Sequence, residues 1–232
     1  MADQFARDQG SDALPLVALK SVSLGYDSAP VVQGVDLSIH PHDLIGFAGP
    51  NGSGKTTILR AILGFLPVQA GRIARHCALS DFGYVPQSTA LDPQFPLSVD
   101  EVVEMGAYGR VRSYQLLPHE EKQKRREVLD QVGLRHLGKK SFFSLSGGQK
   151  QRILIARALM VQPKIMILDE PLSGVDRDSQ RAITELLVKL NREKGLAIFF
   201  SSHDLEMVRT VAAKILRIDK GKVWWERGGP LS

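Results

Sequence analysis

The chain has 232 residues, of which 43% are hydrophobic, and a formal net charge of +5. This length suffices for one α/β domain with an inserted subdomain and a sizeable buried core. No apolar run approaches the length that crosses a bilayer, the N-terminus lacks the pattern of a signal peptide, and the single cysteine, Cys77, excludes an internal disulfide. We therefore expect a soluble cytoplasmic protein, and the modest positive charge identifies no partner by itself.

The first ordered element is expected after a polar tail of residues 1–14, which lacks periodicity. Residues 16–26 and 31–40 alternate apolar with polar side chains around a turn-forming stretch, and this pattern predicts an antiparallel hairpin. Tyr26 lies near the turn. An aromatic ring there serves either the core or a stacking surface, and the residues favour neither.

A glycine-rich motif follows the apolar run of residues 44–48 and precedes a helical pattern over residues 56–63. It fits the pattern G-x-x-x-x-G-K-[ST], whose glycines let successive N–H groups converge on an anion at a helix N-terminus. Lys55 then supplies a charge for the β- and γ-phosphates, and the Thr56 hydroxyl is placed to bind Mg²⁺. The motif predicts a site for a nucleoside triphosphate. Its residues are Gly49, Pro50, Asn51, Gly52, Ser53, Gly54, Lys55, Thr56 and Thr57.

The segment beyond this motif changes from strand to helix. Short strands are predicted up to residue 85, just before Gln87, and from residue 98 the apolar period becomes helical. Residues 118–133 predict a second helix with a long charge run, which is typical of a solvated helix face. We therefore expect residues 88–143 to form a mostly helical insertion in the α/β core.

Ser146, Gly147 and Gly148 open the next predicted helix. A serine before paired glycines at a helix start is a second place where bare N–H groups can receive a phosphate. One nucleotide does not need two such cradles in one domain.

A continuous apolar run, residues 165–168, is typical of a central parallel strand and ends in Asp169 and Glu170. Carboxylates at the tip of a buried strand are costly unless they are used, and the alternation of side chains prevents both from facing the same way. One is therefore expected to serve a metal ion and the other a water molecule. Another buried strand, residues 196–200, ends just before His203. The remaining patterns predict helices over residues 176–193 and 205–212 and strands over residues 214–218 and 222–225.

Together these motifs resemble the ATP-binding subunit of ABC transporters, from about residue 16 to residue 225. The resemblance implies a single nucleotide-binding domain over residues 15–232. Its expected fold class is α/β, a P-loop NTPase core of the ABC ATPase type with an antiparallel β subdomain and an inserted helical subdomain. The residues that match the family's motifs outside the phosphate loop are Tyr26, Gln87, Ser146, Gly147, Gly148, Gln149, Asp169, Glu170, Asp176 and His203.

In this family, two cassettes pack head to tail, so that the phosphate loop of one and the signature helix of the other clamp the same ATP. The resemblance implies a homodimer through shared ATP sites, with ATP and Mg²⁺ as cofactors. Tyr26 would stack on adenine. Glu170 would act as general base and His203 would orient the water. Mg²⁺ would be held by Thr56, Gln87 and, through a water, Asp169. Glu170, His203 and Gln87 are thus the candidate catalytic residues.

Residues 95–110 and 170–176 resemble bacterial importers for zinc, manganese or chelated iron. This implies an ATPase on the cytoplasmic face of the inner membrane, bound peripherally to an integral membrane permease. The full system would include an extracytoplasmic solute-binding protein, and no nucleic acid partner is expected. Phe95, Val99 and Val102 form either a groove for a permease helix or simple packing within the insertion.

Other functions stay open on the sequence alone. One is a soluble ABC ATPase acting on nucleic acid or ribosomes, which a positive charge suits, although the chain has no long coiled-coil insertion and no second cassette. Another is an importer cassette for a different solute. A nucleotide-responsive module without turnover is a third, and Glu170 and His203 argue against it.

Overall fold

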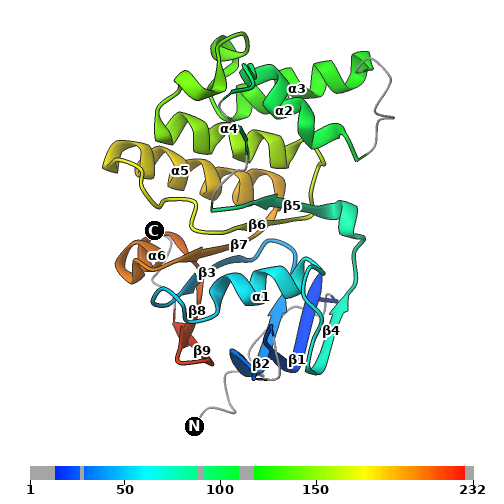
Figure 1. Cartoon of the computed structure of the whole chain (residues 1–232), viewed down its shortest axis with the longest axis vertical. Helices are drawn as coiled ribbons and strands as arrows, with labels where there is room; N and C mark the ends of the chain where they lie inside the picture. Colours follow the sequence, from blue (N-terminus) through cyan, green and yellow to red (C-terminus); the bar gives the residue numbers. More distant parts are fainter. Residues whose placement is uncertain (1–13, 27–28, 88–90, 93, 110–117, 228–232) are drawn as a thin grey trace.

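The computed structural model describes residues 14–26, 29–87, 91–92, 94–109 and 118–227. The expected polar tail, apart from Leu14, and parts of the expected insertion lie outside the described residues. Figure 1 shows two sheets with helices between and beyond them.

The smaller sheet is antiparallel and has the order β2-β1-β4. In it, β1 (Val17–Leu24) pairs with β2 (Val32–Ile39) on one side and with β4 (Ala70–Arg75) on the other. The predicted hairpin is therefore confirmed. Its buried apolar side chains, such as Leu19 and Val35, belong to a core that this sheet shares with the larger sheet.

The larger sheet has the order β5-β6-β7-β3-β8-β9, and its strands run parallel except for the last pair. Its elements are β3 (Leu44–Ala48), β5 (Phe82–Val85), β6 (Ile165–Leu168), β7 (Ala197–Ser202), β8 (Lys214–Asp219) and β9 (Lys222–Arg227). The strand β7 continues two residues beyond its predicted end because Ser201 and Ser202 pair with Phe47 and Ala48 of β3. The carboxyl ends of β3, β6 and β7 consequently meet at one edge.

Helices cover both faces of this larger sheet (Figure 1). α1 (Lys55–Ile62) packs in the core between the two sheets. The second core lies on the opposite face and contains α2 (Val99–Glu104), α3 (His119–Gln131), α4 (Gly147–Leu159), α5 (Arg177–Lys194) and α6 (Leu205–Val211). Short 3₁₀ turns lie between β4 and β5, at Leu79–Asp81, and within the helical region, at Met105–Ala107, Arg135–Leu137 and Phe142–Ser144. Among the described residues, none of the helices combines the length and the apolar character needed to span a membrane.

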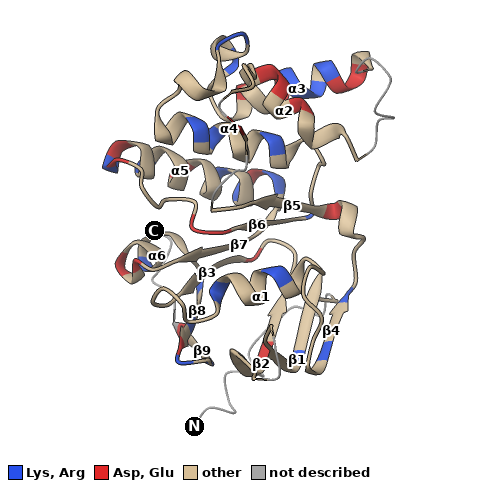
Figure 2. Cartoon of the chain, viewed as in Figure 1, with Lys and Arg blue, Asp and Glu red and all other residues tan. Residues whose placement is uncertain are grey.

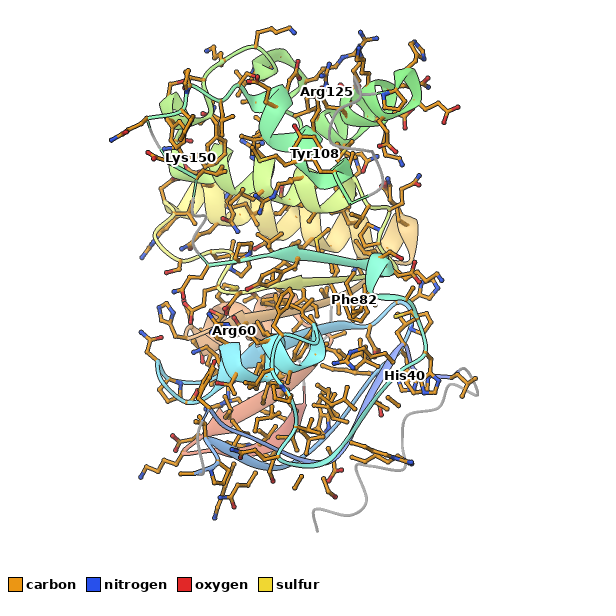
Figure 3. All side chains as sticks on the ribbon, turned by 45° about the vertical axis from the view of Figure 1, so that its right-hand side comes forward. His40, Arg60, Phe82, Tyr108, Arg125 and Lys150 are labelled. Carbon is orange, nitrogen blue, oxygen red and sulfur yellow. The ribbon has the colours of Figure 1, made fainter. Side chains whose placement is uncertain are left out.

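The helical region decides between the two alternatives for Val99 and Val102. Val99 and Val102 are fully buried in the core, so they line no open groove, and simple packing accounts for them. Phe95, in contrast, is 64% exposed. Figure 2 marks the charge run on α3, in which Glu120, Lys122, Arg126 and Glu127 are exposed. Arg125 instead turns inward and lies 3.3 Å from Asp100. Figure 3 places Arg125 at the helical end of the molecule, where this ion pair joins α3 to α2.

Candidate nucleotide site

The glycine-rich loop joins the carboxyl end of β3 to α1 and lies against β2 and β8. Gly54 has a φ of +106°, and a Cβ there would approach Val32 Cγ2 to 2.4 Å. A Cβ on Gly49 would stand 2.4 Å from the Ile218 carbonyl oxygen. Only glycine can therefore hold the loop at this distance from its neighbours.

The backbone N–H groups at the N-terminus of α1 have no side-chain cap. Its N-cap residue, Gly54, makes no side-chain hydrogen bond, whereas α4 and α5 are capped by Ser146 and Asp176. The buried Ser53 hydroxyl also has no hydrogen-bond partner. Because buried donors without partners are costly, an anion that accepts their hydrogen bonds fits this loop.

Lys55, only 5% exposed, supplies the cation of the site. Its ammonium donates to the carbonyl oxygens of Gly49, at 2.8 Å, and Pro50, at 3.0 Å. It also lies 3.3 Å from Glu170 Oε1. A buried ammonium is stable only with such partners, and here they hold the charge at the mouth of the loop.

A hollow of about 360 Å³ opens beside this lysine. Its lining residues are Tyr26, Val31, Asn51, Gly52, Gly54, Lys55, Thr56, Thr57, Gln87 and Glu170. Tyr26 is 56% exposed, which excludes the core alternative for its ring, and its hydroxyl accepts a hydrogen bond from Arg60 at 3.3 Å. Val31 and Arg60 were missed by the sequence analysis, because no motif marks them.

The two carboxylates after β6 have different partners. Asp169 Oδ2 accepts a hydrogen bond from Thr56 Oγ1 at 2.8 Å, and its Oδ1 accepts one from Ser201 Oγ at 2.7 Å. Glu170 Oε2 instead lies 2.7 Å from Nδ1 of His203. Glu170 also has a φ of +48°, a strained conformation for a residue with a side chain. The backbone thus changes direction at Glu170, and the two carboxylates reach different partners.

Mg²⁺ prefers hard oxygen ligands, and the residues here supply them. The Thr56 hydroxyl and the Asp169 carboxylate are in direct contact, and Gln87 lines the same hollow as Thr56. This donor set fits a magnesium ion beside the phosphates.

The signature residues are not brought to this hollow within one chain. Ser146 and Gln149 instead form a reciprocal cap on α4, in which Ser146 Oγ accepts from the Gln149 N–H at 3.3 Å and Gln149 Oε1 accepts from the Ser146 N–H at 3.1 Å. Asp176 caps α5 by accepting from the Ser179 N–H at 3.0 Å. Hydrogen bonds from Ser179 hold the pKa of the Asp176 carboxyl below its ordinary value. None of these residues lines the hollow beside Lys55.

The sequence profile of ABC transporters matches residues 32–173. The chain belongs to the ABC transporter family. It is 33% identical to the zinc import ATP-binding protein ZnuC of Saccharophagus degradans over 213 residues, which cover 90% of this chain and 77% of that protein. It is 36% identical to the manganese transport system ATP-binding protein MntB of Bacillus subtilis over 212 residues, which cover 89% and 84%.

Solved ABC structures have the same fold. An inward-facing transporter described as of the metal-chelate type superposes with a TM-score of 0.86 at 30% identity, covering 93% of this chain and 84% of that one. A dimeric ATP-binding cassette in a post-hydrolysis state with ADP and Pi superposes with a TM-score of 0.78 at 29% identity, covering 93% and 99%.

These comparisons confirm the predicted family and the fold class. The chain is the ATP-binding and ATP-hydrolysing subunit of an ABC transporter. The hollow beside Lys55 is accordingly its candidate site for ATP.

Proposed function

We propose that this ABC subunit drives the import of a transition metal ion, with zinc and manganese as the leading candidates, through a separate membrane permease. The observation that carries the proposal is the identity of 33% to a zinc import protein and of 36% to a manganese transport protein, each over nearly the whole chain. These names also argue against an ABC ATPase that acts on nucleic acid. The metal is cargo of the permease and does not bind this subunit.

The subunit would sit on the cytoplasmic face of the inner membrane through its permease, and a solute-binding protein would complete the system outside. Residues 15–232 would form one nucleotide-binding domain, with residues 88–143 as its helical subdomain. The permease contact is proposed at the apolar surface beside β5. There Phe65 is 70% exposed and packs edge-on against Tyr84, next to a hollow lined by Met105 and Gly106. A short permease helix fits such a groove.

For hydrolysis, Lys55 would bind the β- and γ-phosphates together with the N–H groups of the loop. Thr56, Gln87 and Asp169 would hold Mg²⁺, which neutralises developing charge on the phosphates. Glu170 would accept a proton from the attacking water, because its carboxylate lies at the hollow beside Lys55. His203, 2.7 Å from Glu170 Oε2, would orient that water.

Two copies would close head to tail around the ATP. Ser146, Gly147, Gly148 and Gln149 of one chain, with its Asp176, would then meet the nucleotide held by the other. Two findings support this arrangement. The signature residues do not line the nucleotide hollow of their own chain, and a similar cassette is dimeric with ADP and Pi.

The proposed import of zinc or manganese is tested by measuring the zinc and manganese content of cells. We expect deletion of the gene to lower cellular zinc or manganese under chelation, and the parent chain, but not Glu170→Gln, to restore it. The chain should also co-purify with an integral membrane protein from detergent-solubilised membranes. Unchanged zinc and manganese in the deletion strain, together with loss of another solute, would refute metal import and favour the cassette of a different importer.

A further inference from the structure

Ser201 is a buried hydroxyl at the place where two strands of the larger sheet end. It belongs to β7, is 0% exposed and pairs with Phe47 of β3. On the other side, Leu168 of β6 pairs with Phe200, so the next residue, Asp169, leaves β6 beside Ser201. A polar side chain in such an apolar position needs partners.

Both partners of this hydroxyl belong to the acidic pair. Ser201 Oγ donates to Asp169 Oδ1 at 2.7 Å and accepts from the backbone N–H of Glu170 at 2.9 Å. The same oxygen therefore contacts the carboxylate of one residue and the backbone of the next.

Ser201 and Thr56 together restrain the Asp169 carboxylate, because each hydroxyl bonds to a different oxygen. Thr56 donates to the second oxygen, Oδ2, at 2.8 Å. With one hydroxyl on each oxygen, the carboxylate plane cannot rotate without breaking a charge-assisted hydrogen bond in a buried environment. Ser201 thus keeps Asp169 directed toward Thr56.

The contact with Glu170 acts on its backbone. Glu170 has a φ of +48°, and such a conformation persists only when surrounding contacts impose it. The hydrogen bond from its N–H to Ser201 is one of these contacts, and the side chain that follows reaches His203 Nδ1 at 2.7 Å.

We propose that Ser201 is a positioning residue for ATP hydrolysis: its single hydroxyl orients the metal-side carboxylate of Asp169 and the water-side residue Glu170 at the same time. The inference rests on the roles proposed above for these two residues. The neighbouring Ser202 differs, because its hydroxyl accepts from the Asp204 N–H at 3.0 Å instead of bonding to either carboxylate.

The first test is Ser201→Ala in the full chain. We expect kcat for ATP to fall about tenfold or more, where tenfold corresponds to about 1.4 kcal/mol of transition-state stabilisation. The KM for ATP should stay within about twofold, since Lys55 and the phosphate loop are untouched. The Mg²⁺ concentration for half-maximal rate should rise, because Asp169 loses one of the two hydroxyls that orient it. A merely structural serine would not move the Mg²⁺ requirement.

Two controls separate positioning from stability. Ser201→Thr keeps the hydroxyl and should recover most of the lost kcat. Ile198→Val removes a methylene from the same buried strand, three residues before Ser201, and should lower the melting temperature without changing kcat or the Mg²⁺ requirement. If Ser201→Ala does not fold, Ser201→Cys, with a weak donor of similar size, carries the same comparison.

The outcomes are distinct. An alanine variant with parental kcat and Mg²⁺ requirement would overturn the inference, and so would a loss of kcat that Ile198→Val shares. Glu170→Gln is measured in parallel. If that variant keeps full turnover, the role proposed for Glu170 is wrong; if it loses turnover while Ser201→Ala does not, only the role of Ser201 is wrong.

Discussion

Alanine placed separately at Gly147 and at Gly148 should give two different defects. A Cβ on Gly148 would stand 2.2 Å from Ser179 Oγ and 2.3 Å from Ser179 Cβ. Since α4 and α5 would have to move apart, we expect a loss of about 1–3 kcal/mol in the free energy of unfolding. The melting temperature would then fall by roughly 2–4 °C per kcal/mol for a domain of this size.

Gly147 has room for the same methyl group. The nearest atoms to its added Cβ, Gly174 O and Val175 Cγ1, both lie at 3.7 Å, an ordinary contact distance. We therefore expect Gly147→Ala to change the free energy of unfolding by less than about 0.5 kcal/mol. Its Cβ would nevertheless stand at the helix start that is proposed to face the partner's ATP, so hydrolysis and ATP-driven dimerisation should fall.

The assay combines thermal unfolding with size-exclusion chromatography in ATP, in a Glu170→Gln background that retains the nucleotide. Gly147→Ala should melt at the temperature of the parent but form less dimer in ATP, and a bulkier residue at this position should reduce the dimer further. Dimerisation equal to the parent would refute the shared site. Equal destabilisation of Gly147→Ala and Gly148→Ala would refute the packing argument.

Three further predictions concern Glu170, Tyr26 and Cys77. Glu170→Gln should slow hydrolysis by about 10²-fold or more and leave ATP binding nearly intact, because it removes the general base and spares the phosphate loop. Unchanged turnover, measured by phosphate release, would contradict the role of Glu170 as general base. Tyr26→Ala should raise the KM for ATP by about two- to tenfold because the stacking on adenine is lost, whereas Tyr26→Phe should have the KM of the parent chain. Equal KM values for the parent and both variants would exclude stacking. Burial and, to a lesser extent, the charge of Asp81 raise the pKa of the Cys77 thiol. Because less thiolate then exists at a given pH, alkylation at pH about 8 should be slower in the folded chain than in urea. Equal alkylation rates would show that the thiol pKa is not raised.

Local pattern in the sequence was enough to predict the phosphate loop and most of the helices and strands. The loop depends on glycines at fixed spacing between a buried strand and a helix, and short-range backbone geometry determines it. The caps of α4 and α5 are equally local, because Ser146 and Asp176 bond to N–H groups three residues away. The end of β7 was predicted two residues too early, because pairing with β3 sets it.

Contacts between distant residues were decided only by the tertiary structure. The periodicity of residues 99–103 indicated an apolar helix face but not what covers it, and packing against α4 buried Val99 and Val102. Ser201 fell just beyond the predicted strand and belonged to no motif. Its bonds to Asp169 and Glu170 could not be predicted, because they span more than thirty positions and depend on the register of β6 and β7. Spacing along the chain specifies which backbone conformations are possible, whereas sheet register and side-chain packing specify which polar groups meet.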